Sequence, residues 1–213
     1  MPYHLSLLAS HLGPAISRQP RRAATWIVIL TIAAVCGCGG RRPLPTSGVA
    51  PEPTAPRTLS VARLFQLETG GPPANDTSLT LVSGTRRVVV LYHASESIVF
   101  ARLSFEAAAF GDSGQTVQVN VRPRPGIYGL DLATDLPFRA GQTTITFVYG
   151  RYFSAPARAR QVYGSDVAFE KALAVGQLLN DGQVSLLPTS RPAPDNVQAA
   201  LPIPGSYVVA APQ

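Results

Sequence analysis

Regular alternation of polar and apolar side chains constrains the fold of this chain more than any other feature of its sequence. Two segments, 116–122 and 143–149, alternate over seven residues. Because successive side chains of a strand point to opposite faces, each segment is predicted to be a strand with one buried face. The residues expected on the buried faces are Val117, Val119, Val121, Ile145, Phe147 and Tyr149.

Shorter or less regular apolar segments predict the remaining strands. Residues 88–92 are apolar on both faces, which is typical of a central strand that is covered on each side. The sequence Asn180-Asp181-Gly182 favours a tight turn and predicts a hairpin over 173–187. One short helix is expected over 166–172. The further predicted strands are 58–67, 79–83, 86–93, 97–105, 127–133, 173–179, 183–187 and 206–210.

Turn residues are frequent along the whole chain of 213 residues, which contains 20 prolines and 18 glycines. Such a composition favours short strands and excludes a bundle of long helices. Short strands with a turn about every 8 to 12 residues indicate an all-β fold. We therefore predict an antiparallel β-sandwich, immunoglobulin-like in its general architecture.

An apolar segment near the start of the sequence predicts export. Arg21 and Arg22 precede about 13 mostly apolar residues, too few to cross a bilayer, which takes about 20. Val35-Cys36-Gly37-Cys38 follows and resembles the lipobox of bacterial lipoproteins. The resemblance implies that residues 1–37 are a signal peptide and that Cys38 is acylated. Cys36 fits less well, because Val35 would then precede the cleaved bond. An ordinary cleaved signal peptide is the alternative.

The lipobox resemblance also implies a location and a domain organisation. Lipid chains on Cys38 would hold the protein at a bacterial membrane, and the outer membrane is favoured where one exists, because Gly39 replaces the aspartate that retains some lipoproteins. Residues 38–57 are rich in proline and are expected to form an extended tether, about 3.1 Å per residue. Residues 58–213 are then the β-sandwich domain.

The predicted domain contains few of the residues that catalysis and metal binding commonly use. His93 is its sole histidine, and it has neither Met nor Trp. No glycine-rich phosphate loop is present, and the net charge falls once the three arginines of residues 1–37 are set aside. We therefore predict no cofactor, no metal and no nucleic-acid partner. Carbohydrate binding through tyrosine remains an alternative.

Three groups of residues are candidates for a catalytic or metal site. The first, Gly111-Asp112-Ser113-Gly114, resembles the nucleophile loop of chymotrypsin-like proteases, but its only candidate base is His93, and the order and spacing differ from that family. We predict a polar turn instead. The others are a metal site at His93, Glu96 and Glu106, and a carboxylate pair among Asp112, Asp131 and Asp135. We predict that His93 is simply a histidine at a strand end and that the acids are solvated.

A group of arginines and aromatic residues after Gly150 is the predicted binding surface. Gly150 interrupts the strand that begins at Thr143, and a glycine within a strand often marks a bulge that re-aims a neighbouring side chain. The side chains that follow could bind an anionic polymer of the cell envelope; in the alternative, Phe153 enters the core and the arginines are solvated. The residues of this predicted surface are Arg151, Tyr152, Arg158 and Arg160.

Taken together, these features predict a lipid-anchored envelope protein that displays a non-enzymatic β-sandwich for binding or assembly. Its expected partner, besides the membrane, is another envelope protein or an anionic polymer. The alternative function is that of an envelope hydrolase.

Overall fold

Two antiparallel sheets form most of the protein in a computed structural model that describes residues 56–213. The predicted signal peptide and Cys38 lie outside the described residues. The larger sheet has the strand order β1 (Arg57–Ser60), β12 (Gln183–Leu186), β11 (Ala174–Leu178), β15 (Gly205–Pro212), β8 (Gly129–Thr134), β7 (Thr116–Pro123) and β4 (Thr77–Val82), and β2 (Leu64–Gln66) also pairs with β15.

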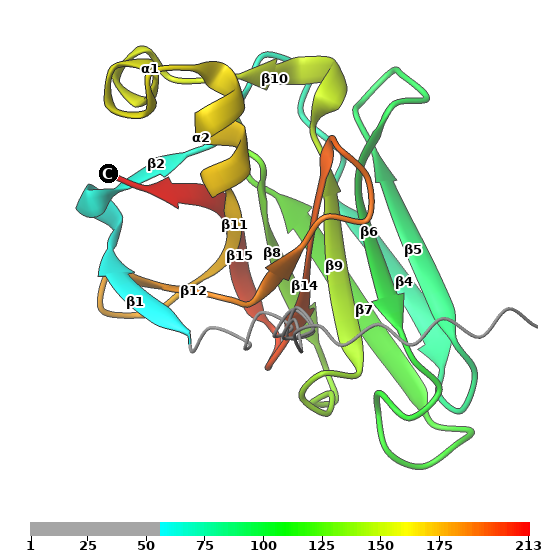
Figure 1. The fold of residues 1–213 in the computed structure, drawn as a ribbon. Coiled ribbons are helices and arrows are strands. Elements are labelled where there is room, and N and C mark those ends of the chain that lie inside the picture. Colours follow the sequence, from blue (N-terminus) through cyan, green and yellow to red (C-terminus); the bar gives the residue numbers. More distant parts are fainter. Residues whose placement is uncertain (1–55) are drawn as a thin grey trace, which may run out of the picture. The chain divides into compact units, whose positions relative to one another are not determined.

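The second sheet has five strands and faces one part of the first (Figure 1). Its order is β13 (Thr189–Ser190), β14 (Asn196–Leu201), β9 (Thr143–Val148), β6 (Val99–Phe105) and β5 (Arg87–Tyr92). A two-stranded sheet, β10 (Phe153–Ser154) with β3 (Glu68–Thr69), completes the pairing. The predicted all-β antiparallel sandwich is therefore confirmed. No helix among residues 56–213 is long and apolar enough to cross a membrane.

The main core lies between the two sheets and takes its side chains from the faces that the alternation predicted. On β7 the three valines are buried and the polar residues between them are exposed. Tyr128, Leu130 and Leu132 are buried on or beside β8, and Ile145 and Phe147 are buried on β9. Each of these strands therefore contributes one apolar face to a shared core.

A second, smaller core lies on the other face of β15. Tyr207 and Val209 point into the main core, whereas Val208 and Ala210 pack in a separate cluster with Val184. This cluster lies within the curled part of the large sheet, where β1, β12, β11, β15 and β2 follow one another around a ring (Figure 1). Strand β15 thus has both faces buried and belongs to both cores.

Two short helices and two 3₁₀ turns complete the described residues. The predicted helix over 166–172 is confirmed as α2 (Asp166–Ala172); the Ser165 side chain caps it by accepting from the backbone N–H of Ala168 at 3.1 Å. Helix α1 (Ala157–Tyr163) was not predicted. Both helices pack on β2, where the rings of Tyr163 in α1 and Phe169 in α2 meet Phe65 at centroid distances of 6.5 and 6.4 Å. The 3₁₀ turn η1 (Val61–Arg63) precedes β2.

Three strand predictions need correction. Residues 58–67 form two strands separated by η1, because β1 pairs with β12 while β2 pairs with β15. Gly150 does not lie in a bulged strand: β9 ends at Val148, and Gly150 begins the 3₁₀ turn η2 (Gly150–Tyr152). A side chain there would meet Asp195, since an added Cβ would lie 2.7 Å from its Oδ2.

The third correction concerns the strand predicted over 86–93. It was expected in the centre of a sheet, but β5 is an edge strand and pairs only with β6. The side chains of Val88 and Tyr92 are about half exposed, at 50% and 47%. On its outer face Val88 and Tyr92 are therefore exposed, and Val90 between them is partly buried.

Candidate binding site

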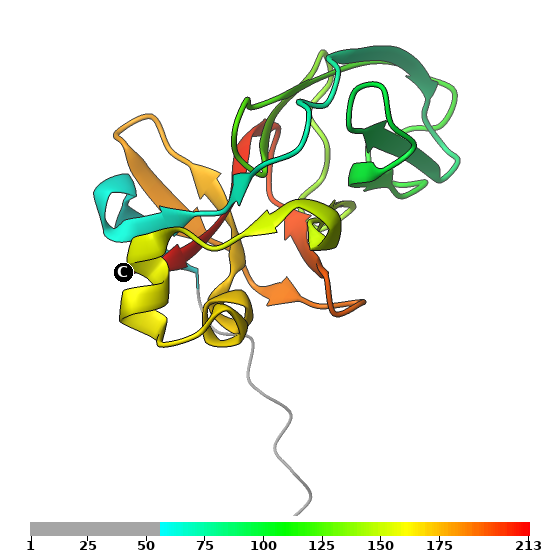
Figure 2. The same cartoon turned by 90° about the horizontal axis from the view of Figure 1, so that it is seen from above.

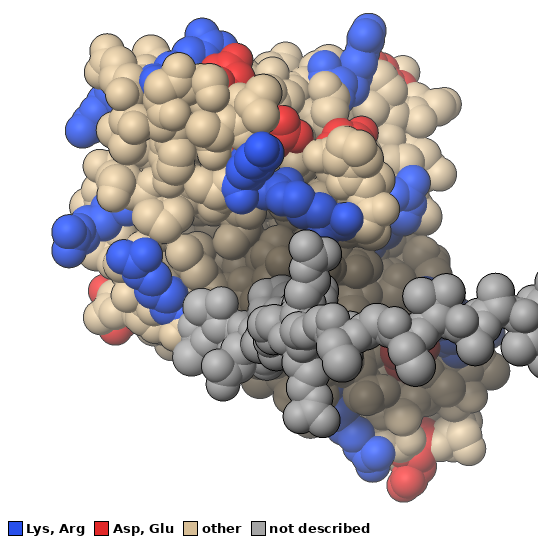
Figure 3. Space-filling model, in the orientation of Figure 1, with Lys and Arg blue, Asp and Glu red and all other residues tan. Residues whose placement is uncertain are grey.

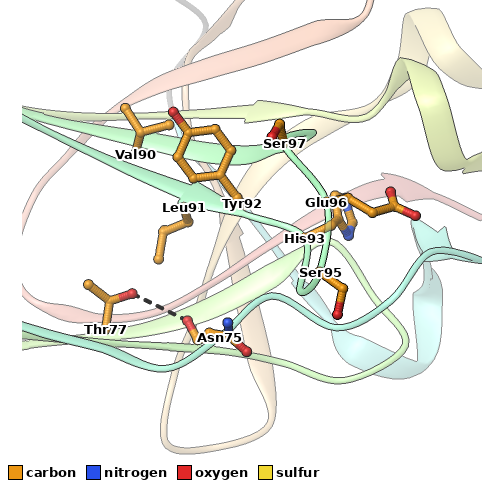
Figure 4. Close-up of a pocket in the computed structure, with 9 residues that line it drawn as sticks. All are labelled: Asn75, Thr77, Val90, Leu91, Tyr92, His93, Ser95, Glu96 and Ser97. Atoms are coloured by element: carbon orange, nitrogen blue, oxygen red, sulfur yellow. Dashed lines mark hydrogen bonds between the residues drawn. The ribbon is translucent and has the colours of Figure 1, made fainter.

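An open pocket lies where the segment before β4 meets the turn between β5 and β6 (Figure 4). Its volume is about 630 Å³. We refer to it as the His93 pocket, and its lining residues are Asn75, Thr77, Val90, Leu91, Tyr92, His93, Ser95, Glu96 and Ser97.

His93 forms the inner wall of this pocket and is almost fully buried, at 1% exposure. Its Nδ1 lies 2.6 Å from the carbonyl oxygen of Pro72, and because a carbonyl can only accept, Nδ1 carries the proton. The rings of Phe100, Tyr128 and Tyr152 surround the imidazole at centroid distances of 5.4, 6.2 and 4.8 Å. The imidazole is thus fixed in place as part of an aromatic cluster.

The turn that follows His93 has an unusual backbone conformation. Ser95 has φ of 66°, the one positive value at a residue other than glycine in the described part of the chain. The N–H of Glu96 donates to the carbonyl of His93 at 3.1 Å, and the Tyr152 hydroxyl donates to the Glu96 carboxylate. This hydrogen bond raises the pKa of Tyr152. The bond also fixes the outer end of the turn against η2.

The structure divides the predicted arginine surface into two parts. Tyr152, with Arg151 beside it in η2, lies next to the His93 pocket. Arg158 and Arg160 lie in α1, on the other side of β10 in Figures 1 and 2, and Arg160 Nε donates to Asp166 Oδ1 at 2.7 Å. The four residues therefore do not form one continuous surface.

Charged side chains elsewhere are dispersed. On the face drawn in Figure 3, basic side chains appear in several separate places, some with acidic side chains beside them. Glu106, weighed above as a metal ligand, pairs with Arg86 at 3.2 Å. Asp131 Oδ1 accepts from Arg124 and from the Ser206 hydroxyl. Residues 56–213 contain no group of three or more His, Cys, Asp or Glu side chains that could hold a metal ion.

The protease-like turn lies far from the only histidine of the described residues. The N–H of Gly114 donates to the carbonyl of Ser83 at 3.0 Å, so Ser113 lies beside the turn that precedes β5. His93 follows the last residue of β5. A strand of six residues spans about 20 Å, so the two side chains are separated by roughly that length. His93 therefore cannot act as a base for Ser113 in this fold.

Replacing Ser113 with alanine is expected to have almost no effect. The Ser113 side chain is exposed, and alanine keeps its Cβ beside Gly84, so the free energy of unfolding should change by less than about 0.5 kcal/mol. Urea denaturation of parent and Ser113→Ala protein measures this change. A fluorophosphonate probe should leave Ser113 unlabelled, and labelling that disappears in Ser113→Ala would show that a base activates it.

A partly buried polar network, which sequence reasoning missed, fixes the connection between β12 and β14. The Tyr149 hydroxyl donates to Glu170 Oε1 and accepts from Arg191, both at 2.9 Å. Arg191 also donates to the carbonyl of Leu173 at 3.0 Å. Burial, together with the hydrogen bond to Glu170, raises the pKa of Tyr149. These contacts connect the end of β9, α2 and Arg191. The polar side chains of Tyr149, Glu170 and Arg191 are thus hydrogen-bonded within the network.

The outer edge of β5 also went unrecognised as a candidate binding surface. Three of the large apolar side chains that remain exposed lie on β4 and β5, at Val82, Val88 and Tyr92. In Figure 4, Val90 and Tyr92 point to one side of β5 and Leu91 to the other, so the outer face of this strand is apolar along its length. The repeated valines do not distinguish this exposed edge from the central strand that the sequence predicts, because both are apolar on two faces.

Comparisons with protein-family models, with curated proteins and with solved structures found no match.

Proposed function

We propose that this chain is an exported protein, anchored by lipid at Cys38, whose β-sandwich serves in binding or assembly at a bacterial envelope and not in catalysis. The observation that carries the proposal is the edge strand β5. Its backbone pairs on one side only, and its outer face presents Val88, Val90 and Tyr92. An exposed apolar edge strand is a template for pairing with another polypeptide.

The surroundings of β5 also favour binding over catalysis. The one histidine of the domain is buried in aromatic contacts, with its Nδ1 bonded to Pro72. The pocket beside β5 combines the exposed Tyr92 ring with amide, hydroxyl and carboxylate side chains. Tyrosines that are half exposed at a pocket rim are frequent contributors to protein interfaces.

A photo-crosslinking experiment in intact cells tests this function. Tyr92 is replaced by benzoylphenylalanine, and the matched control carries the same group at Val162, which is 59% exposed on α1. We expect ultraviolet light to join the Tyr92 variant to a defined protein adduct, because the β5 edge is a contact surface. The control should give little or none. Equal adducts at both positions, or none at Tyr92, would contradict a binding role for β5.

A further inference from the structure

The outer face of the large sheet carries polar side chains that lie in rows across three neighbouring strands. Strand β7 lies between β4 and β8, and every second side chain of β7 points away from the main core. Asn120 lies opposite Ser78 on β4 and opposite Ala133 on β8. In the next row of the same face, Arg122 lies opposite Asp131. These side chains therefore share one surface, although they come from distant parts of the chain.

These two rows surround a hollow of about 260 Å³, which we call the β7 hollow. Ala133 is exposed, and its small side chain leaves the space beside Asn120 open. Pockets for drug-sized ligands measure about 300–1,000 Å³, so this hollow has room for one small chemical unit. Its lining residues are Asp76, Ser78, Asn120, Val121, Arg122, Asp131 and Ala133.

Asp131 is held in the hollow through one of its two carboxylate oxygens. Oδ1 accepts from two nitrogens of Arg124, at 3.0 and 2.8 Å, and from the Ser206 hydroxyl at 2.6 Å. No residue among 56–213 donates a hydrogen bond to Oδ2. The carboxylate is therefore fixed in orientation, while its second oxygen is available to accept hydrogen bonds from a ligand.

The other polar side chains of the hollow are also fixed by one neighbour each. The Ser78 hydroxyl donates to Asn120 Oδ1 at 2.7 Å, which leaves the Asn120 amide nitrogen as a free donor. Arg122 Nε donates to Asp76 Oδ2 at 3.2 Å, and the other nitrogens of this guanidinium have no acceptor in the described part of the chain. The hollow thus combines oriented acceptors with oriented donors.

The charges of the hollow are balanced. Asp76 pairs with Arg122 at 3.2 Å, and Asp131 pairs with Arg124 at 2.8 Å. A charged ligand gains little where each charge already has a partner of opposite sign. A hydroxyl group, by contrast, can donate to a carboxylate and accept from an amide or a guanidinium. A neutral molecule with several hydroxyl groups therefore matches this surface best.

From this geometry we infer that the β7 hollow binds one sugar unit of a neutral polysaccharide. Neighbouring hydroxyl groups of the sugar donate to Asp131 Oδ2 and accept from the Asn120 amide, and its apolar side lies against Ala133. The side chains of Arg122 and Asp76 are 76% and 66% exposed, so the hollow is open and the polymer can continue beyond it.

The composition of the hollow also sets the strength of binding. No aromatic side chain is among its lining residues, so a sugar unit is held by hydrogen bonds without ring stacking. We therefore expect weak binding of a single sugar and stronger binding when several anchored copies engage one polymer. This inference goes beyond the proposed function, because the hollow and β5 lie on different sheets and need different ligands. The photo-crosslinking at Tyr92 and the experiment below can thus fail independently.

A polysaccharide array tests the ligand class. The detergent-solubilised full chain is applied to surfaces that carry neutral dextran, mannan, galactan or xylan, and to anionic alginate and polygalacturonate for comparison. We expect binding to at least one neutral polymer, and this binding should persist as salt rises because no net charge is screened. An absence of binding to every neutral polymer, or binding to anionic polymers alone that salt releases, would overturn the inference.

Substitutions on β7 and β8 test the location. Asn120→Ala removes the free donor. Asp131→Asn keeps an oxygen for Arg124 but replaces the free acceptor by an amide donor. Each should lower the amount bound about tenfold, because each loses a hydrogen bond to the sugar. Circular dichroism verifies that both variants are folded, and Asn120→Ala carries the test if Asp131→Asn accumulates poorly.

Gln118→Ala is the matched control. Gln118 lies on the same strand and face as Asn120 and bonds to Thr80 on β4, as Asn120 bonds to Ser78, but it does not line the hollow. Its replacement should leave binding unchanged. Equal losses from Gln118→Ala and Asn120→Ala, or full binding by both Asn120→Ala and Asp131→Asn, would show that the β7 hollow is not the site.

Discussion

Phe147→Ala is expected to lower the free energy of unfolding by about 3–5 kcal/mol, as for other buried phenylalanines. Phe147 is fully buried on β9, which lies between β6 and β14 in the middle of the smaller sheet. Its ring meets Phe100 edge to face at 5.8 Å, and Phe100 in turn stacks on Tyr128, which directly precedes β8 of the facing sheet. Truncation would leave a cavity in the centre of the sandwich and remove the ring that supports Phe100 against Tyr128.

Urea denaturation of the detergent-solubilised full chain measures this loss. For a domain of this size, each kcal/mol corresponds to about 2–4 °C in the thermal midpoint, so Tm should fall by about 6–20 °C. Val162→Ala is the control, because Val162 is exposed on α1 and should cost less than about 0.5 kcal/mol. A change below about 1 kcal/mol at Phe147 would show that the two sheets do not share the core described here.

Cys38→Ser is expected to abolish incorporation of labelled palmitate. The prediction follows from the resemblance of residues 35–38 to a lipobox, in which the last cysteine receives the lipid. Each buried CH₂ of an acyl chain contributes about 0.8 kcal/mol to membrane binding, so two or three chains anchor a protein stably. In the parent protein, mass spectrometry should find acylated Cys38 as the first residue of the mature chain.

Cys36→Ser provides the matched control for this prediction. Cys36 precedes the expected cleavage site and leaves with the signal peptide, so its loss should leave palmitate incorporation unchanged. Incorporation that disappears with Cys36→Ser and persists with Cys38→Ser would move the anchor to Cys36. If the N-terminus of the mature parent protein is unmodified, the proposed lipid anchor is wrong. The photo-crosslinking experiment at Tyr92 would still test the proposed binding role.

The strands that could be predicted are those in which one face is buried and the other is solvated. In β7 the burial of each residue follows its polarity, because a single core lies on one side only. In β5 the same reasoning failed, since Val88 is as apolar as Val89 and yet is exposed. Sequence reports the polarity of a residue and does not report whether a neighbouring strand exists.

The elements that were missed depend on contacts between distant residues. Helix α1 has no acidic residue in its first turn and no side-chain cap, and its one buried residue is Ala159, which packs in the main core. Strand β14 alternates only weakly, because Ala199 contributes little hydrophobicity to its buried face. Their formation therefore depends mainly on packing against the rest of the domain.

The candidate site was predictable only in fragments. Tyr152 was identified from its local sequence, and His93 was noted as the sole histidine of the domain. That these two rings pack at 4.8 Å, with Glu96 bonded to the tyrosine, depends on two turns that are far apart in the chain. Such long-range proximity leaves no periodic signal in a single sequence.

The position of β15 has a consequence for the order in which the domain can fold. This strand follows all other described strands in sequence, yet it pairs with β11 on one edge and with β8 and β2 on the other. Earlier strands can form hairpins, but the large sheet and both cores stay incomplete until β15 arrives. During synthesis the five-stranded sheet has all its strands before β15 is made, whereas the large sheet does not. The large sheet and the small core are therefore completed last, after every other described strand is available to pair with β15.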